Sequence, residues 1–145
     1  MDWDSPLISR LIDSWIEEDL GTGDLTASII KKENGKAEWI SKEEGIFCGS
    51  EVIKRIFNKI DNKIKIKFVK NDGTLFLKND RILELNGPPK SLLAGERITL
   101  NIAMHLSGIS TYTIKLVKKL NGTKIHLADT RKTTPGLRKL EKYAF

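Results

Sequence analysis

The feature that most constrains the fold of this 145-residue chain is a short segment near its C-terminal end, residues 124–143. An apolar run at 125–128 passes into a polar cluster, and Pro135 follows with a helix-like pattern. A strand that delivers polar residues to a helix start is typical of parallel β/α units, whose strands are apolar on both faces. We therefore predict a strand at 124–128 and a helix with Thr134 as N-cap and Pro135 in its first turn.

The polar cluster between the predicted strand and helix has the chemistry of an anion site. Its members are Asp129, Thr130, Arg131, Lys132, Thr133 and Thr134. Arg131 offers a planar fork matched to a carboxylate or phosphate, and Lys132 adds a compact point charge. Unpaired N–H groups at a helix start would add partial positive charge. A solvated loop is the structural alternative, and the local pattern leaves both interpretations open.

Composition restricts the class of protein. The 25 Lys and Arg residues against 19 Asp and Glu residues give a net charge of +6, which favours anionic ligands but also suits non-specific nucleic-acid binding. The lysines are scattered and aromatic residues are few, so we expect no nucleic-acid partner. The single Cys48 fits a reducing compartment. Because the sequence shows neither a secretory pattern nor a run of the ~18 apolar residues that a membrane span needs, we expect a cytoplasmic protein without a membrane partner.

Before the terminal unit, the chain predicts a mixed layer of helices and mostly antiparallel strands. Apolar residues at three- and four-residue spacing predict helices over 5–21 and 50–60. A turn at 21–24 and an apolar segment at 25–30 follow the first helix. Short strands are expected at 37–41, 45–48, 64–68, 74–77 and 81–85. A long helical pattern then starts near Ser91 and ends at Asn121, with Gly108 as a weak point in its middle.

Two common classes of site are not indicated. The sequence contains neither GxxxxGK followed by Ser or Thr nor GxGxxG, so the usual nucleotide-binding loops are not indicated. His105 and His126 lie far apart and the cysteine is isolated, so metal-ligand spacing is not present. We expect His105 to be a packed or interface residue and His126 to be a core residue of the predicted strand.

Four stretches, in this order along the chain, resemble the quinolinate phosphoribosyltransferase family. They are EDLGTGDLT at 18–26, GER at 95–97 followed by LN at 100–101, LSGIST at 106–111, and DTRKTTPGLR at 129–138. Each stretch alone is a weak signal, but the four in the right order are specific. The resemblance covers essentially the whole chain, as the N-terminal half of such an enzyme.

The resemblance implies a fold of the α+β class with two parts. An open-faced α/β sandwich domain would span residues 1–113, including the start of the long helix. Residues 114–145 would begin a TIM-like α/β barrel that is truncated here after its first strand and helix. In barrel enzymes the active groups lie at the C-terminal ends of the strands, which is where the polar cluster falls in the sequence.

The resemblance also implies an activity in NAD biosynthesis. The family transfers phosphoribose from phosphoribosyl pyrophosphate to quinolinate and releases carbon dioxide and pyrophosphate, giving nicotinate mononucleotide. Thr130, Arg131 and Lys132 match substrate-binding positions, while catalytic residues stay unassigned. Arg97 matches an arginine that reaches into the active site of the partner subunit, which implies a homodimer. Mg²⁺ would accompany phosphoribosyl pyrophosphate, with ligands outside this chain.

Two other interpretations stay open. A related phosphoribosyltransferase would take another acceptor, such as nicotinate or the substrate of the molybdate-locus relatives, and competition with phthalate would separate it from a quinolinate enzyme. A non-catalytic fragment, or an interaction module that binds nucleic acid, would show a steep salt dependence of nucleic-acid affinity. Because a lone opening strand leaves an unpaired edge, we expect this chain by itself to associate and to be inactive.

Overall fold

The computed structural model describes residues 1–21 and 34–145. The elements in chain order are α1 (Pro6–Leu20), β1 (Gly35–Ile40), β2 (Gly45–Ile46), α2 (Ser50–Ile60), β3 (Lys65–Val69), β4 (Leu75–Phe76), β5 (Arg81–Gly87), α3 (Pro89–Leu120) and α4 (Arg138–Ala144). These helices and strands confirm the predicted α+β class. The predicted segment at 25–30 and most of the first family-like stretch lie outside the described residues.

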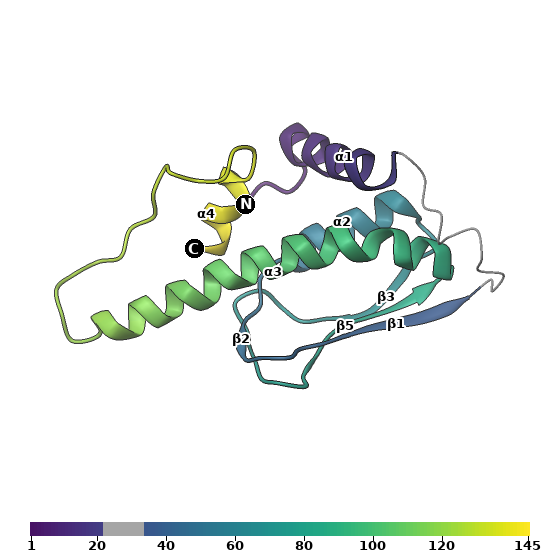
Figure 1. Ribbon diagram of the computed structural model, residues 1–145. Coiled ribbons are helices and arrows are strands. Elements are labelled where there is room, and N and C mark those ends of the chain that lie inside the picture. The colour runs from purple at the N-terminus through teal and green to yellow at the C-terminus, as the bar shows by residue number, and fades with distance from the viewer. Residues whose placement is uncertain (22–33) are drawn as a thin grey trace.

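A three-stranded antiparallel sheet with the order β1-β5-β3 forms the base of the fold, and α1, α2 and α3 lie on one side of it (Figure 1). The sequence alternation explains this arrangement, because the side chains of Lys36, Glu38 and Ile40 on β1 are exposed while those between them are partly buried. Arg81 and Glu84 of β5 join Lys36 and Glu38 in an ion-pair network. One face of the sheet is therefore apolar and covered, and the other is charged.

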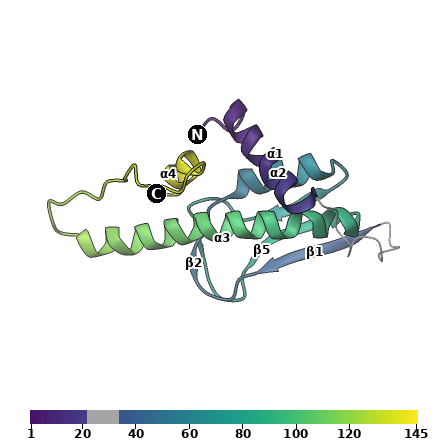
Figure 2. The same cartoon turned by 45° about the horizontal axis from the view of Figure 1, so that its top comes forward.

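Two apolar clusters hold the helices in place. The first fills the space between the sheet and the helix pair α2 and α3, and its Phe57 side chain is 1% exposed. The second lies among α1, α2, α3 and α4, where Ile8 and Ile12 of α1 meet Leu106 of α3 and Leu140 of α4. Figure 2 shows α1 crossing over α2 on the outer side of this layer. The core therefore consists of two stacked layers, with α2 and α3 shared between them.

Gly95 sets how closely α2 and α3 approach each other. A Cβ atom at this position would lie 2.4 Å from Cε1 of Phe57. Since that aromatic ring is fully enclosed, it has no free space into which to move. The glycine that opens the stretch at 95–97 is therefore required by packing between two helices.

The long helix α3 is continuous from Pro89 to Leu120, which makes it two residues longer at its start than predicted. Gly108 does not interrupt it, and a Cβ atom there would meet nothing within 4 Å. The second half of α3 extends past the sheet (Figure 1) and carries exposed apolar side chains such as Met104 and Tyr112, which are 62% and 65% exposed. The predicted domain boundary at 113/114 falls inside this helix and stays a prediction.

The predicted strand at 124–128 is wrong. These residues have no regular secondary structure, and His126 is exposed rather than buried in a core. A strand exists only through hydrogen bonds to a neighbouring strand, and none of the described strands pairs with this segment. The apolar pattern alone could not reveal that condition.

The predicted start of the last helix is also wrong. The structure forms a β-turn over residues 134–137, closed by a hydrogen bond of 3.0 Å from the Leu137 amide N to the Thr134 carbonyl O. Gly136 has a φ of 85°, which is the left-handed conformation that favours glycine. Proline followed by glycine is the preferred pair for such a turn. The helix α4 therefore begins at Arg138, and Thr134 is not its N-cap.

Across residues 1–21 and 34–145, every helix is too short or too polar to cross a membrane.

Candidate functional site

Residues 129–134, called here the cationic segment, lie between α3 and α4. Two main-chain bonds lie entirely within this segment. The Lys132 amide N donates to Thr130 Oγ1 at 3.1 Å, and the Thr133 amide N donates to the Arg131 carbonyl O at 3.0 Å. These bonds set the shape of the segment but do not connect it to the rest of the fold.

Side chains of α4 make the connection. Arg138 donates from Nε to Thr133 Oγ1 at 3.2 Å and from Nη2 to the Arg131 carbonyl O at 3.4 Å. Lys142 forms an ion pair with Asp129. The short helix α4 thus contacts the cationic segment both at its start and near its end.

Glu141 is the least exposed of these α4 contacts, with 12% of its side chain exposed. Its Oε2 accepts a hydrogen bond of 3.1 Å from the Thr134 amide N, and its Oε1 accepts one of 2.8 Å from His105 Nε2 on α3. Burial acts to raise the pKa of Glu141, but the hydrogen bonds from Thr134 and His105 outweigh it and hold the pKa below its ordinary value. The His105 side chain is 39% exposed and has a carboxylate partner, so the prediction of a packed residue is wrong, while a role at an interface stays a prediction.

Arg131 and Lys132 are both exposed, and neither forms an ion pair within the described ranges. The one carboxylate of the cationic segment, Asp129, is engaged by Lys142. Thr130 Oγ1 accepts a hydrogen bond from the main chain, which leaves its hydroxyl proton free to donate. The segment therefore presents two cations and a hydroxyl donor on a shaped main chain.

The structure does not bring Arg97 into this cluster. Arg97 lies near the start of α3, where its Nε donates to Asp19 Oδ1 of α1 at 3.1 Å. Its side chain is 65% exposed. Within the part of the chain that the structure describes, its only ion pair is with Asp19. The sequence prediction thus separates into one cluster of three residues and one arginine that stands apart from them.

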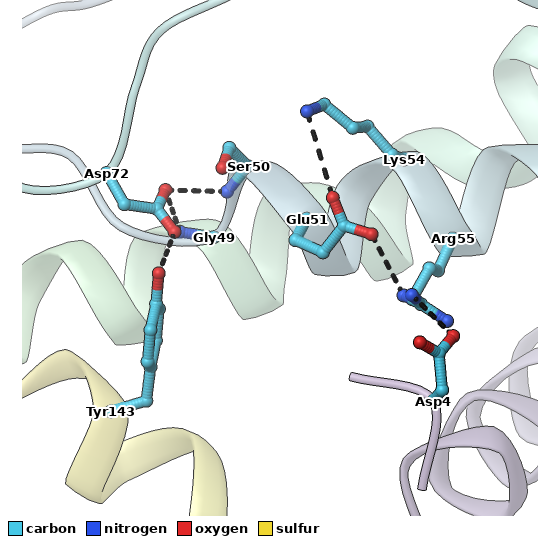
Figure 3. A network of polar contacts seen from close by, with 8 residues as sticks. All are labelled: Asp4, Gly49, Ser50, Glu51, Lys54, Arg55, Asp72 and Tyr143. Carbon is cyan, nitrogen blue, oxygen red and sulfur yellow. Dashed lines mark hydrogen bonds and ion pairs between the residues drawn. The ribbon is translucent and has the colours of Figure 1, made fainter. Parts of the chain in front are cut away.

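Sequence reasoning missed the residue that fastens α4 to the sheet layer. Asp72 accepts hydrogen bonds from the amide N atoms of Gly49 and Ser50, at 2.9 and 2.8 Å, at the start of α2. Its other oxygen accepts one of 2.8 Å from the Tyr143 hydroxyl on α4 (Figure 3). Burial, the hydrogen bond to Asp72 and the negative charge of that carboxylate all raise the pKa of Tyr143 above its ordinary value.

The turn at 71–73 was recognisable from its sequence as Asn-Asp-Gly, but a turn pattern does not show which helix its carboxylate will cap. A second network shown in Figure 3 joins Glu51 and Arg55 of α2 to Asp4 near the N-terminus. Both networks fasten elements around α2, and neither reaches the cationic segment directly.

Two hollows of about 490 and 510 Å³ flank the second half of α3, and neither is lined by the cationic segment. The segment therefore lies on an open surface. Within residues 1–21 and 34–145, no three His, Cys, Asp or Glu side chains converge into a group that could hold a metal ion. Two cations and a hydroxyl donor have the chemistry that suits an anionic ligand.

Comparison with known proteins identifies the family of the chain. A model described as quinolinate phosphoribosyl transferase, N-terminal domain, matches residues 22–107, and one described as the C-terminal domain of the same enzyme matches residues 109–145. The chain is 46% identical over 138 residues to a probable nicotinate-nucleotide pyrophosphorylase (carboxylating) of Bacillus subtilis, covering 94% of this chain and 48% of that protein. A protein with the same description from Methanocaldococcus jannaschii is 40% identical, covering 93% of this chain and 48% of its own length.

Solved structures agree with the sequence comparison. The nicotinate-nucleotide pyrophosphorylase of Francisella tularensis superimposes with a TM-score of 0.90 at 40% identity, covering 95% of this chain and 50% of that one. The chain thus spans about half the length of the relatives it matches. With its own elements matching both domain models in order, the chain belongs to the quinolinate phosphoribosyl transferase family.

Proposed function

We propose that the protein transfers phosphoribose from phosphoribosyl pyrophosphate to the quinolinate nitrogen. The reaction releases carbon dioxide and pyrophosphate and gives nicotinate mononucleotide, a precursor of NAD. One observation carries the proposal: Arg131 and Lys132 lie exposed and without carboxylate partners among the described residues, on a segment whose main chain is held in place. The match to both domain models of the family supports it.

The chemistry of the substrates fits these side chains. Quinolinate carries two adjacent carboxylates and phosphoribosyl pyrophosphate is a polyanion, so both need matched cations when they leave water. Arg131 is suited to a bidentate bond with one carboxylate, and Lys132 is suited to the second carboxylate or to a phosphate oxygen. The free hydroxyl proton of Thr130 adds a third donor.

The same charges would act on the reaction itself. Departure of pyrophosphate builds positive charge on the ribose, and loss of carbon dioxide builds negative charge on the pyridine ring. Groups that are already in place stabilise such charges without reorganising during the reaction. We assign Arg131 and Lys132 to substrate binding, and no residue of this chain to proton transfer.

Arg97 belongs to the proposal as a residue that completes the site of a partner subunit in a homodimer. Its exposure of 65%, and its position apart from the cationic segment, support a role outside its own subunit. The ion pair with Asp19 would hold the guanidinium in one orientation until substrate competes for it. A dimer that lacks this arginine on one chain only would lose activity in the site that receives it.

Mg²⁺ is proposed to arrive with phosphoribosyl pyrophosphate. The described residues do not form a ligand group for it. We also propose that the protein works in the cytoplasm, where the free buried thiol of Cys48 would stay reduced.

The first test is production of nicotinate mononucleotide by the protein expressed from its complete gene, supplied with quinolinate and phosphoribosyl pyrophosphate. In that protein, Arg131→Ala should weaken quinolinate binding at least about tenfold, or roughly 1.4 kcal/mol. Arg131→Lys keeps the positive charge but loses the planar guanidinium, so its affinity for quinolinate should lie between those of the unmodified protein and Arg131→Ala. Lys139→Ala removes an exposed cation from α4 that forms no ion pair among the described residues, and it should bind quinolinate as the unmodified protein does.

Unchanged quinolinate affinity in Arg131→Ala would refute the assignment. Competition by phthalate but not by nicotinate would confirm the acceptor as a dicarboxylate. The reverse order would point to a related phosphoribosyltransferase.

A further inference from the structure

Among residues 1–21 and 34–145, no backbone–backbone hydrogen bond joins the cationic segment to a strand or to the packed layers. The backbone–backbone bonds of residues 121–137 reach no farther than the last turn of α3 on one side and the first turn of α4 on the other. Within the described residues, side chains therefore set where the segment lies. Those side chains come from α4: Arg138, Glu141 and Lys142.

These three contacts are not equivalent. Arg138 and Lys142 are exposed, and exposed ion pairs and hydrogen bonds contribute little because water and salt screen them. The Glu141 side chain is 12% exposed and accepts two charge-assisted hydrogen bonds, one on each oxygen, from the exposed residues His105 and Thr134. Its neighbour in sequence, Leu140, is 1% exposed in the cluster that also contains residues of α1 and α3. The helix position of Glu141 is thus fixed by packing.

The two hydrogen-bond partners of Glu141 belong to different parts of the structure. His105 belongs to the rigid helix α3, and Thr134 ends the cationic segment. The position of Thr134 also restrains the residues before it. The neighbouring Thr133 amide N binds the Arg131 carbonyl O, and Arg138 binds both Thr133 and Arg131. A carboxylate therefore relays the position of α3 to the main chain that carries the two cations.

We propose that Glu141 is a positioning residue for the anion site. It links His105 to the Thr134 amide and thereby sets where Arg131 and Lys132 stand relative to the rest of the protein. This inference rests on the proposed function, since the cations must bind substrate for their placement to matter. Displacements near 1 Å in such a group reduce rates by up to about a hundredfold.

The test uses the protein expressed from its complete gene. Glu141→Ala removes both hydrogen bonds, and the KM for quinolinate should rise roughly tenfold with a smaller change in kcat. Glu141→Gln should restore the KM to within about threefold, because its amide O can accept from Thr134 while its amide N donates to His105. His105→Ala cuts the link on one side only and should raise the KM by an intermediate amount. Lys139→Ala, on the neighbouring exposed position, serves as the matched control.

A second measurement does not depend on turnover. Amide hydrogen exchange should accelerate at 131–134 in Glu141→Ala, and it should stay near the unmodified rate in Glu141→Gln and Lys139→Ala. Unchanged exchange in Glu141→Ala would overturn the positioning role. Faster exchange with an unchanged quinolinate KM would overturn its relevance to the site.

The two proposals fail in different ways. If the unmodified protein produced no nicotinate mononucleotide, the proposed function would fall while the exchange result still decided whether Glu141 places the segment. If Glu141→Ala did not fold, His105→Ala and Glu141→Gln would decide the question by the same two measurements. An equal loss in Glu141→Gln and Glu141→Ala would also count against the proposal, because Gln preserves the geometry.

Discussion

The sheet layer and the C-terminal segment of this molecule are held together by different forces. In the sheet layer, β1, β3 and β5 share an antiparallel ladder, and side chains such as Phe57 and Leu83 are completely enclosed. In residues 121–137, which join α3 to α4, a few side-chain hydrogen bonds hold the chain in place, and the charged groups face water. The cations that we assign to substrate thus lie where the chain contributes little to folding.

This difference teaches where each kind of substitution should act. Changes in the sheet layer should alter the free energy of unfolding, and changes near the cationic segment should alter binding with little effect on unfolding. Asp72 and Glu141 are exceptions, because each joins α4 to an element of the packed layer. Substitutions at these two residues should therefore affect both the free energy of unfolding and binding.

The largest expected effect is at the crossing of α2 and α3. Gly95→Ala places a Cβ 2.4 Å from the enclosed ring of Phe57, and overpacking of this kind costs about 1–3 kcal/mol. Gly108→Ala, on the same helix, meets nothing within 4 Å and should stabilise by up to about 1 kcal/mol through helix propensity. Denaturant unfolding of both variants measures the difference, and two changes of the same sign would contradict this account of the packing.

A smaller effect is expected where the two regions meet. Asp72→Ala removes the carboxylate that binds the first amides of α2 and the Tyr143 hydroxyl, and loss of such a cap costs about 1–2 kcal/mol. Tyr143→Phe removes only the last of these bonds and should cost about 0.5–1.5 kcal/mol. The unfolding free energies of these two variants and of the double variant give the interaction energy between Asp72 and Tyr143. A loss in Tyr143→Phe that equals the loss in Asp72→Ala would mean that the cap of α2 contributes nothing.

The smallest effect is a pH dependence confined to the C-terminal segment. The pKa of Glu141 is below its ordinary value of 4.5 in the folded protein, so its contribution to stability is fully present above pH 4.5 and is lost as pH falls through the lower folded-state pKa. Intrinsic amide exchange slows as pH falls in this range, so exchange at Thr134 on acidification should be faster than the intrinsic rate predicts. Glu141→Gln, which does not titrate, should abolish that excess. An identical excess in the Gln variant would show that another group is responsible.

Sequence alone predicted the sheet layer well because its elements carry their own periodicity. The apolar spacing at 50–60 gave α2 with the bounds that the structure shows, and strict alternation located β3 to within a residue. The C-terminal segment was predicted poorly for two physical reasons. A strand at 124–128 depends on a partner strand, which no local pattern contains, and the pair Pro135-Gly136 forms a turn in preference to a helix start.

The candidate site divides in the same way. Thr130, Arg131 and Lys132 could be proposed from their side-chain chemistry and from the family resemblance, and their roles stay predictions. The roles of Asp72 and Glu141 could not be found, because each depends on contacts between residues far apart in the chain, such as Asp72 with Tyr143 or His105 with Glu141. Spacing along a sequence carries no information about such pairs.

The continuity of α3 has a mechanical consequence. His105 lies ten residues beyond Gly95 on the same helix, which is about 15 Å along its axis at 1.5 Å per residue. A tilt of about 5° where α3 crosses Phe57 would carry the His105 ring by about 1 Å at the end of that lever. The hydrogen bond from His105 to Glu141 is 2.8 Å long, so a displacement of this size would break or strain it. A small change in the packing of α2 against α3 would therefore also move the cationic segment.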